Sequence, residues 1–175
     1  FLLDAGVYTI YARIIDKNDG CTQSQMEGTV TPAALTVVAD HQTRVYGDSD
    51  PALTFTASGF QLGDQAADVL TGSLVRAAGE NVGSYAIGQG SLAANANYTL
   101  SFTGANLAIT TRSASVTPAS GQSKVYGSAD PILVGTLSGF LDADGVTATY
   151  SRTAGETVLG GPYAISATLS PASVL

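Results

Sequence analysis

Closely spaced aspartates are the side chains of this sequence best suited to bind a metal ion. Asp48 and Asp50 lie two residues apart within Tyr46–Pro51, and carboxylate oxygens are ligands that Ca²⁺ accepts. Local turn chemistry explains the same segment, because Gly47 tolerates a positive φ, Asp side chains bond nearby backbone N–H groups, and proline ends a turn. We predict a structural turn here and keep Ca²⁺ binding at Asp48 and Asp50, or at the junctions between modules, as the open alternative.

A second acidic cluster superficially matches a calcium-binding loop. It begins with Asp16-Lys17-Asn18-Asp19-Gly20, and Glu27 occupies the twelfth position counted from Asp16. The sixth position of such a loop requires glycine, but Cys21 occupies it, and no flanking helices are evident. We therefore predict a hairpin turn at residues 16–20 rather than a metal site.

The chain contains a long internal repeat. The segment Gln42–Phe60 returns as Gln122–Phe140, about 80 residues later, with more than half of its positions identical. Shorter blocks also return: Arg76-Ala77-Ala78-Gly79-Glu80 as Arg152-Thr153-Ala154-Gly155-Glu156, and Gly83-Ser84-Tyr85-Ala86-Ile87 as Gly161-Pro162-Tyr163-Ala164-Ile165, with a third copy at Gly6-Val7-Tyr8-Thr9-Ile10. Solenoid repeats run only about 20 to 50 residues, so each unit here is expected to be a whole small domain.

The repeat weakens every candidate for a functional site. Asp48 becomes Ser128 in the second copy, which leaves Asp130 alone. Glu80 and its counterpart Glu156 show no acid or base partner at matching positions, so Arg76 and Glu80 are interpreted as a surface or capping pair around the Ala77-Ala78-Gly79 turn that adds little stability. His41 is the only histidine, which excludes a zinc triad or a shared Ser/His/Asp set within this sequence. We predict no catalytic residue, no metal site and no cofactor, and hence no enzyme.

Composition indicates a secreted, strand-rich protein. Charged residues make up 12% of the sequence and the net charge is -7, against about 25% charged residues in ordinary soluble domains. The basic residues form no cluster, so a nucleic-acid partner is not expected. No apolar run reaches the roughly 20 residues of a membrane span. Cys21 is the only cysteine, so stability must come from cores and strand pairing rather than disulfides.

The repeats predict three segments. Residues 1–33 are expected to be the C-terminal end of a preceding Ig-like β module, because they hold only the third short copy. Residues 34–112 are expected to form one complete module, here called the first repeat. Residues 113–175, the second repeat, contain no counterpart of Asn97–Phe102 or Ala105–Thr110. We expect this module to be truncated before its last strands and loosely held.

Short alternating segments must build these modules. Tyr98, Leu100 and Phe102 alternate with hydroxyl side chains, as do Leu53 and Phe55, which predicts strands with one buried face. Further strands are expected at residues 35–39, 73–76, 84–87 and 107–110. A short helix capped by Asp64, with Val69 and Leu70 turned inward, should follow residue 63. The second repeat is four residues shorter here, so only a stub around residues 144–148 is expected.

These motifs resemble a known family when they are taken together. KVYGSADP and RVYGDSDP, followed by LxxxxSGF, RxAGE, GxYxI and NYTLSF, are similar to the MBG domain of the YGX type, found in tandem arrays in bacterial surface and secreted adhesins. The resemblance covers residues 34–111 fully and residues 113–175 in part. It implies tandem small β-grasp-like modules, each a sheet with one short helix, so the expected class is mainly β, on the border of α+β. The start of the chain more weakly resembles the closing strands of Ig-like or gliding-adhesin repeats.

Two functions follow as hypotheses. The first is a structural spacer of a large bacterial cell-surface or secreted adhesin, in which short linkers give a stiff rod that presents a distal binding domain. Its partners would be neighbouring repeats, with glycan or host surfaces bound by domains outside this sequence. The alternative is a repeated glycan- or mucin-binding module that gains avidity by repetition. The sequence favours the spacer, because it has no Trp and the repeated Tyr46/Tyr126 and Tyr85/Tyr163 occupy expected turn or core positions.

Overall fold

The computed structural model describes residues 3–15 and 21–171 and separates them into two compact units. The first unit holds the N-terminal hairpin and most of the first repeat, and the second holds the second repeat together with Val45–Gly47. The described residues are mainly β, with many short strands and little helix. The expected fold class is confirmed.

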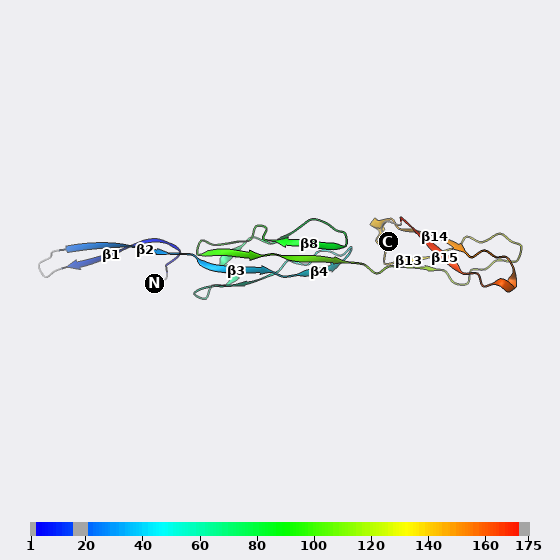
Figure 1. Cartoon of the computed structure of the whole chain (residues 1–175), viewed down its shortest axis with the longest axis horizontal. Helices are drawn as coiled ribbons and strands as arrows, with labels where there is room; N and C mark the ends of the chain where they lie inside the picture. Colours follow the sequence, from blue (N-terminus) through cyan, green and yellow to red (C-terminus); the bar gives the residue numbers. More distant parts are fainter. Residues whose placement is uncertain (1–2, 16–20, 172–175) are drawn as a thin grey trace. The chain divides into compact units, whose positions relative to one another are not determined.

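The chain begins with a two-stranded antiparallel hairpin of strands β1 (Gly6–Ile15) and β2 (Cys21–Val30). Figure 1 shows the two strands side by side at the N-terminal end of the described chain. Most of their side chains are exposed. The backbone N–H of Ala5 donates to the side-chain oxygen of Asn97 at 2.7 Å, which ties the base of the hairpin to the first repeat. The proposed turn at residues 16–20, and with it most of the calcium-like loop, lies outside the described residues.

Two sheets and a short ladder form the first repeat. One sheet has the order β10-β3-β5, a second has the order β4-β11-β8-β7, and β6 pairs with β9. The strands in chain order are β3 (Ala33–Ala39), β4 (Gln42–Val45), β5 (Phe55–Ser58), β6 (Leu70–Thr71), β7 (Val75–Arg76), β8 (Gly83–Gly88), β9 (Ala93–Ala94), β10 (Tyr98–Thr103) and β11 (Ala105–Thr110). Successive strands pass from one sheet to the other, since β3 is followed at once by β4, and β10 by β11 (Figure 1).

The first and penultimate strands of this repeat pair in parallel. Tyr98 lies opposite Ala33, and the register continues to Thr103 opposite Val38. The start of β3 therefore lies beside the start of β10, and the chain leaves through β11 beyond the end of β10. A parallel pair cannot be joined by a tight turn. Here the segment that connects β3 to β10 contains helix α1 (Ala66–Val69) and strands β4 to β9.

The alternation of the strands places one face of each in a core. Leu35, Val37, Val69, Leu70, Leu92 and Tyr98 form one buried cluster, and Ala39, Ile87, Ala105 and Leu107 form another. Leu35 and Leu107 are fully inaccessible to solvent. The expected inward faces of Tyr98, Leu100 and Phe102 are confirmed, although Leu100 and Phe102 are only half-buried.

The helix differs from its expected form at both ends. Helix α1 spans only Ala66–Val69, and its N-cap is Gln65, which makes no side-chain capping bond. The predicted Asp64 cap is wrong, because the Asp64 carboxylate accepts a hydrogen bond from the Tyr98 hydroxyl at 2.7 Å instead. Val69 and Leu70 are buried, as predicted.

The second repeat forms two separate two-stranded ladders. β12 (Ser115–Pro118) pairs with β13 (Gly135–Ser138), and β14 (Thr147–Arg152) pairs with β15 (Ile165–Ser170). The short 3-10 helices are η1 (Asp142–Asp144) and η2 (Val158–Gly160). Among the described residues, every fully buried apolar side chain lies between Leu35 and Ile109. The apolar side chains of the second repeat that the structure describes are therefore half-buried or exposed.

Three expected element boundaries shift. The stub predicted around residues 144–148 is η1, which ends at Asp144 where Gly145 adopts a left-handed φ of 61°, so Ala148 already belongs to β14. The strand expected at residues 73–76 is only Val75–Arg76, and the strand expected from Leu53 begins at Phe55. Glycine and proline neighbours shorten these strands, because neither residue supports a regular ladder.

Candidate functional site

Four charged side chains form a closed ring in the first repeat. Arg44 Nε donates to Asp50 Oδ1 at 2.7 Å, and Arg76 Nε donates to Asp50 Oδ2 at 2.6 Å. Glu80 closes the ring by accepting from Arg44 Nη2 and, at 2.6 Å, from Arg76 Nη2. The side chain of Arg44 is only 4% exposed. We call Arg44, Asp50, Arg76 and Glu80 the first charge ring.

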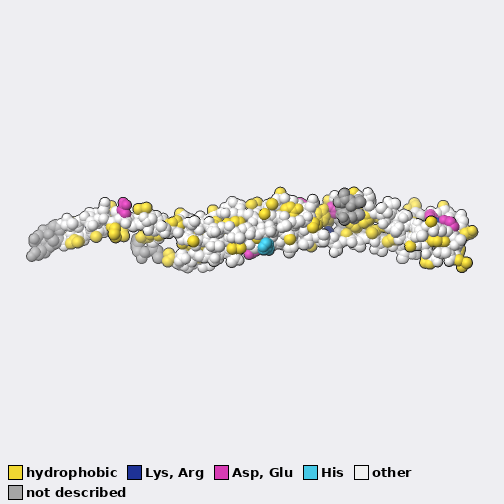
Figure 2. All heavy atoms as spheres, in the orientation of Figure 1, with side chains coloured by type: hydrophobic (Ala, Val, Ile, Leu, Met, Phe, Trp, Pro, Cys, Tyr) yellow, Lys and Arg dark blue, Asp and Glu magenta, His cyan; other side chains and the backbone are white. Residues whose placement is uncertain are grey.

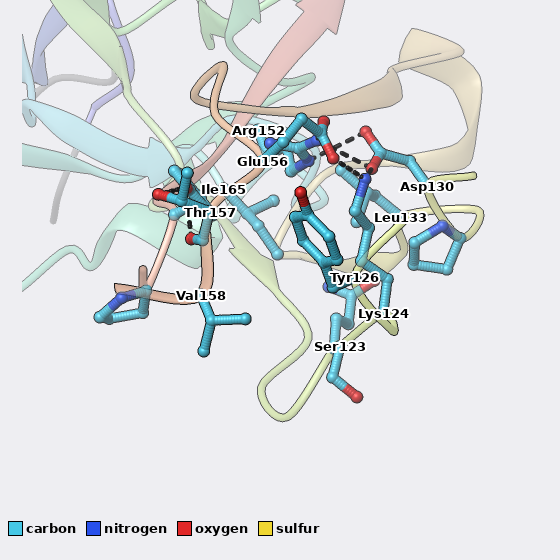
Figure 3. Close-up of a pocket in the computed structure, with 14 residues that line it drawn as sticks. Ser123, Lys124, Tyr126, Asp130, Leu133, Arg152, Glu156, Thr157, Val158 and Ile165 are labelled. Atoms are coloured by element: carbon cyan, nitrogen blue, oxygen red, sulfur yellow. Dashed lines mark hydrogen bonds and ion pairs between the residues drawn. The ribbon is translucent and has the colours of Figure 1, made fainter. Parts of the chain in front are cut away.

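The second repeat builds the same ring from the equivalent positions. Lys124 Nζ lies 2.9 Å from Asp130 Oδ1 and 2.5 Å from Glu156 Oε2. Arg152 Nε and Nη2 each donate to Asp130 at 2.9 Å, and Nη2 also donates to Glu156 Oε1 at 2.6 Å. Lys124, Asp130, Arg152 and Glu156 form the second charge ring, whose contacts are drawn in Figure 3. Each ring contains two cations and two anions, so its formal charge is zero.

Strand β7 ends at Arg76 in the first repeat, and β14 ends at Arg152 in the second. The tight turn that follows each arginine positions the ring glutamate. Arg76 Nη1 donates to the carbonyls of Ala77 and Gly79, at 2.9 and 2.6 Å. Arg152 Nη1 binds the matching carbonyls of Thr153 and Gly155, at 3.0 and 2.6 Å. One guanidinium therefore holds both the turn backbone and the carboxylates, which the planar fork of arginine allows and lysine does not.

Each ring arginine stacks its guanidinium over the aromatic ring of a tyrosine. The Arg76 guanidinium carbon lies 5.6 Å from the centroid of the Tyr85 ring, and that of Arg152 lies 5.3 Å from the centroid of Tyr163. Such a cation over an aromatic face is attracted by the ring quadrupole. The third short copy preserves the tyrosine anchor, because the Tyr8 hydroxyl donates to the carbonyl of Asp4 just as the Tyr85 hydroxyl donates to that of Asn81.

The glycine of the turn lets the tyrosine approach. Gly79 has a φ of +144°, and a Cβ there would lie 2.0 Å from Tyr85 Cε1. Gly155 has a φ of +154°, and its Cβ would lie 2.1 Å from Tyr163 Cε1. Both positions therefore require glycine for conformation and for space.

The rings shift the pKa values of their members. Arg152 and then Lys124 lower the pKa of Asp130 from 3.8 to about 2 by hydrogen bonding. Arg76 lowers the pKa of Asp50 and of Glu80, and Lys124 followed by Arg152 lowers that of Glu156. Glu156, and then Asp130, raise the pKa of Lys124. Every shift favours the charged form, so the rings are ionised near neutral pH and hold no group poised to exchange a proton there.

These rings correct the interpretation of Glu80 and Glu156 from sequence. Arg76 and Glu80 do pair around the turn, as expected, but Arg44 and Asp50 join them, and both glutamates have charged partners at matching positions in the two repeats. The sequence carried the signal, since Arg or Lys, Asp, Arg and Glu recur at the four positions. The pairing of Asp50 with Arg76 cannot be recognised from the sequence, because a turn and a distant strand end are brought together only by the fold.

The other candidate residues lie apart from the rings. His41 is exposed and its Nδ1 accepts a hydrogen bond from the backbone of Asn106 at 3.3 Å. Cys21 is exposed, and Arg13 Nε donates to its sulfur at 2.9 Å. Glu27 is an exposed residue of β2, and Asp48 is exposed in the turn after β4. Tyr126 lies in a turn, one of the two positions expected for it, and is 71% exposed.

Neither a metal cluster nor a membrane helix is found within residues 3–15 and 21–171. No three His, Cys, Asp or Glu side chains of these segments gather in a way that could hold a metal ion. No helix there is long and apolar enough to cross a membrane.

A protein-family model decides the relationship of this chain to known proteins. The model described as the MBG domain (YGX type) matches residues 35–108 and, a second time, residues 114–173. The chain belongs to the MBG domain family of the YGX type. No curated protein and no solved structure shows a significant match.

The two MBG domains share the ring as their most complete common constellation. The Tyr-Gly of the YGX motif follows the first ring cation by two residues, at Tyr46-Gly47 and at Tyr126-Gly127, and the ring aspartate comes four residues after the tyrosine. The motif thus places a cation and an acid on either side of one turn. The ring links that turn to a second turn of the same domain, which follows β7 in the first domain and β14 in the second.

Proposed function

We propose that these MBG domains are spacer modules that withstand tension in a large bacterial cell-surface or secreted adhesin, where they present a distal binding domain. The proposal includes an extracellular location, no enzymatic role, and neighbouring repeats as the principal partners. Family membership supports the adhesin context, since the chain carries two tandem copies of an adhesin-type repeat.

The parallel pairing of β3 and β10 is the observation that carries this proposal. Tension along the chain pulls β3 back from its start at Ala33 and pulls β10 forward from its end at Thr103. The two strands are then drawn in opposite directions along their common axis. All hydrogen bonds of the ladder are loaded together, and they must break together rather than one after another.

The charge rings support the same function. In each domain the ring joins the turn at the YGX motif to the turn that follows β7 or β14, so the charged side chains that both domains share hold parts of the same domain together. Charged side chains are few and scattered on the face drawn in Figure 2. The family motif is thus accounted for by contacts within the domain.

The experiment is to stretch the whole chain by its two ends in a single-molecule instrument. We expect residues 34–112 to unfold in one abrupt step that lengthens the chain by up to about 280 Å. Gradual lengthening without such a step would contradict the proposal. Saturable binding on a glycan array, lost in a folded Tyr46→Ala variant, would favour the glycan-binding alternative.

A further inference from the structure

The second MBG domain contains an open groove that the first domain fills with its own chain. The groove has a volume of about 270 Å³. Figure 3 shows the second charge ring at one end, with Tyr126, Val158 and Ile165 among the residues around the cavity. Gln122–Lys124 and Pro162–Tyr163 also line it.

Strand β11 occupies the equivalent place in the first domain. It lies between β4 and β8 in the sheet, with Leu107 opposite Tyr85 and Ala105 opposite Ile87. Leu107 is fully buried and Ile109 is 2% exposed. By the repeat alignment, β4 corresponds to Gln122–Val125 and β8 to Gly161–Ser166, and residues of both segments line the groove on its two sides as β4 and β8 flank β11.

Within residues 111–171, Gln122–Val125 has no strand partner, and Gly161–Ser166 pairs with a strand on one edge only. β15 pairs with β14 alone, so its other edge carries no strand there. Gln122–Val125 forms no strand, although the equivalent Gln42–Val45 does. Ile165 is half-buried, whereas its equivalent Ile87 is 1% exposed. The second domain thus has the backbone edges and the apolar surface that receive β11 in the first.

We propose that this groove is an acceptor site for a β-strand of the β11 type: an extended, uncharged polypeptide segment with apolar side chains at alternating positions. The segment would lie antiparallel to Gly161–Ser166, as β11 lies antiparallel to β8. Its apolar side chains would cover Tyr163 and Ile165, and its backbone would pair with both sides of the groove. This is strand addition to an unpaired sheet edge.

The chemistry of the groove sets that of the occupant. The cations and acids of the second charge ring satisfy one another, so the groove offers no unpaired charge of the ring to a charged segment. β11 itself has no charged side chain in Ala105–Thr110, and its Thr110 hydroxyl donates to the carbonyl of Arg44 at 3.2 Å. The carbonyl of Lys124 is the equivalent acceptor in the groove.

The test uses the whole chain and a fluorescent peptide with the sequence of residues 104–111. We expect saturable binding by fluorescence anisotropy, and slower amide hydrogen exchange at residues 122–125 and 161–166 in the bound chain. Two peptide controls need no change to the protein. Leu107→Asp with Ile109→Asp removes the apolar side chains, whereas Ala108→Pro keeps them and removes a backbone donor.

Each control peptide should bind at least about tenfold more weakly, which corresponds to about 1.4 kcal/mol. In the protein, Ile165→Asn should weaken binding by a similar factor, while Ile132→Asn, at an exposed position outside the groove, should not. Exchange protection of β14 and β15 shows whether each variant is folded. Equal binding of the proline peptide, protection elsewhere, or self-association of the chain in place of peptide binding would overturn the proposal.

Discussion

Arg152 lies over the aromatic ring of Tyr163, 5.3 Å from guanidinium carbon to ring centroid, while the same guanidinium binds Asp130, Glu156 and two turn carbonyls. Arg76 makes the same set of contacts with Tyr85 below it. One side chain thus joins a strand end, two turns and an aromatic ring in each domain.

The two cations of a ring are expected to differ in their tolerance of lysine. The second domain already has Lys124 where the first has Arg44, so Arg44→Lys should lower the urea midpoint of the first domain only slightly. Arg76→Lys should lower it clearly more, because an ammonium cannot bind two carboxylates, two carbonyls and an aromatic face at once. Equal shifts of the urea midpoint would show that the guanidinium geometry does not matter.

The turn glycines are expected to be irreplaceable for two separable reasons. Gly79→Ala should cost roughly 2 to 4 kcal/mol of unfolding free energy, because it combines positive φ with a clash against Tyr85. Gly63 also has a positive φ, but a Cβ there meets nothing within 4 Å, so Gly63→Ala should cost only about 1 kcal/mol. Chemical denaturation of both variants measures the difference. A cost at Gly79 no greater than at Gly63 would remove the packing argument.

The second domain is expected to lose stability in acid. The folded pKa of Asp130 is about 2, below the ordinary value of 3.8, so the folded state binds this proton less tightly than the unfolded state does. The resulting stabilisation is complete above about pH 4 and is lost as the pH falls through the folded value of about 2. Urea midpoints of the second domain, followed by NMR from pH 7 to pH 2, should fall across that window. The control is Asp130→Asn, whose midpoint should fall less steeply; an unchanged slope would assign the acid sensitivity to other groups.

Equivalent isoleucines are expected to contribute unequally. Ile87 is 1% exposed, whereas Ile165 is half-buried. Ile87→Ala should therefore cost about 3 kcal/mol and Ile165→Ala less than about 2 kcal/mol. Denaturation of each domain, resolved by NMR, provides the comparison. Equal costs would mean that exposure of Ile165 does not reflect its packing in solution.

The sequence predicted the local features of the fold and missed its distant pairings. Alternation was sufficient to locate β3, β8, β10 and β11, because a strand with one buried face shows a two-residue period. The position of α1 and its inward Val69 were predicted, but the predicted capping role of Asp64 is wrong, because the Asp64 carboxylate accepts a hydrogen bond from Tyr98, 34 residues away. A hydrogen bond across the core leaves no trace in local sequence.

The charge rings and the parallel strand pair needed the structure for the same reason. Asp50 and Arg76 are 26 residues apart, and Tyr98 lies opposite Ala33 across most of the domain. Repetition did mark the ring residues, because their charges recur in both domains while Asp48 changes to Ser128. A comparison of charge at every aligned position would have found them. The groove of the second domain was indicated only indirectly, because residues 113–175 contain no counterpart of Ala105–Thr110.

The most direct test of the tension-bearing role is mechanical unfolding of the first domain in two directions. With Cys21→Ser as background, handles on Pro32→Cys and Thr111→Cys shear β10 along β3, whereas handles on Pro32→Cys and Ala96→Cys pull the same two strands apart from one end. All three attachment residues are exposed. Our account predicts a clearly higher unfolding force in the first direction, because the whole ladder is loaded at once. An equal or lower force in that direction would contradict it.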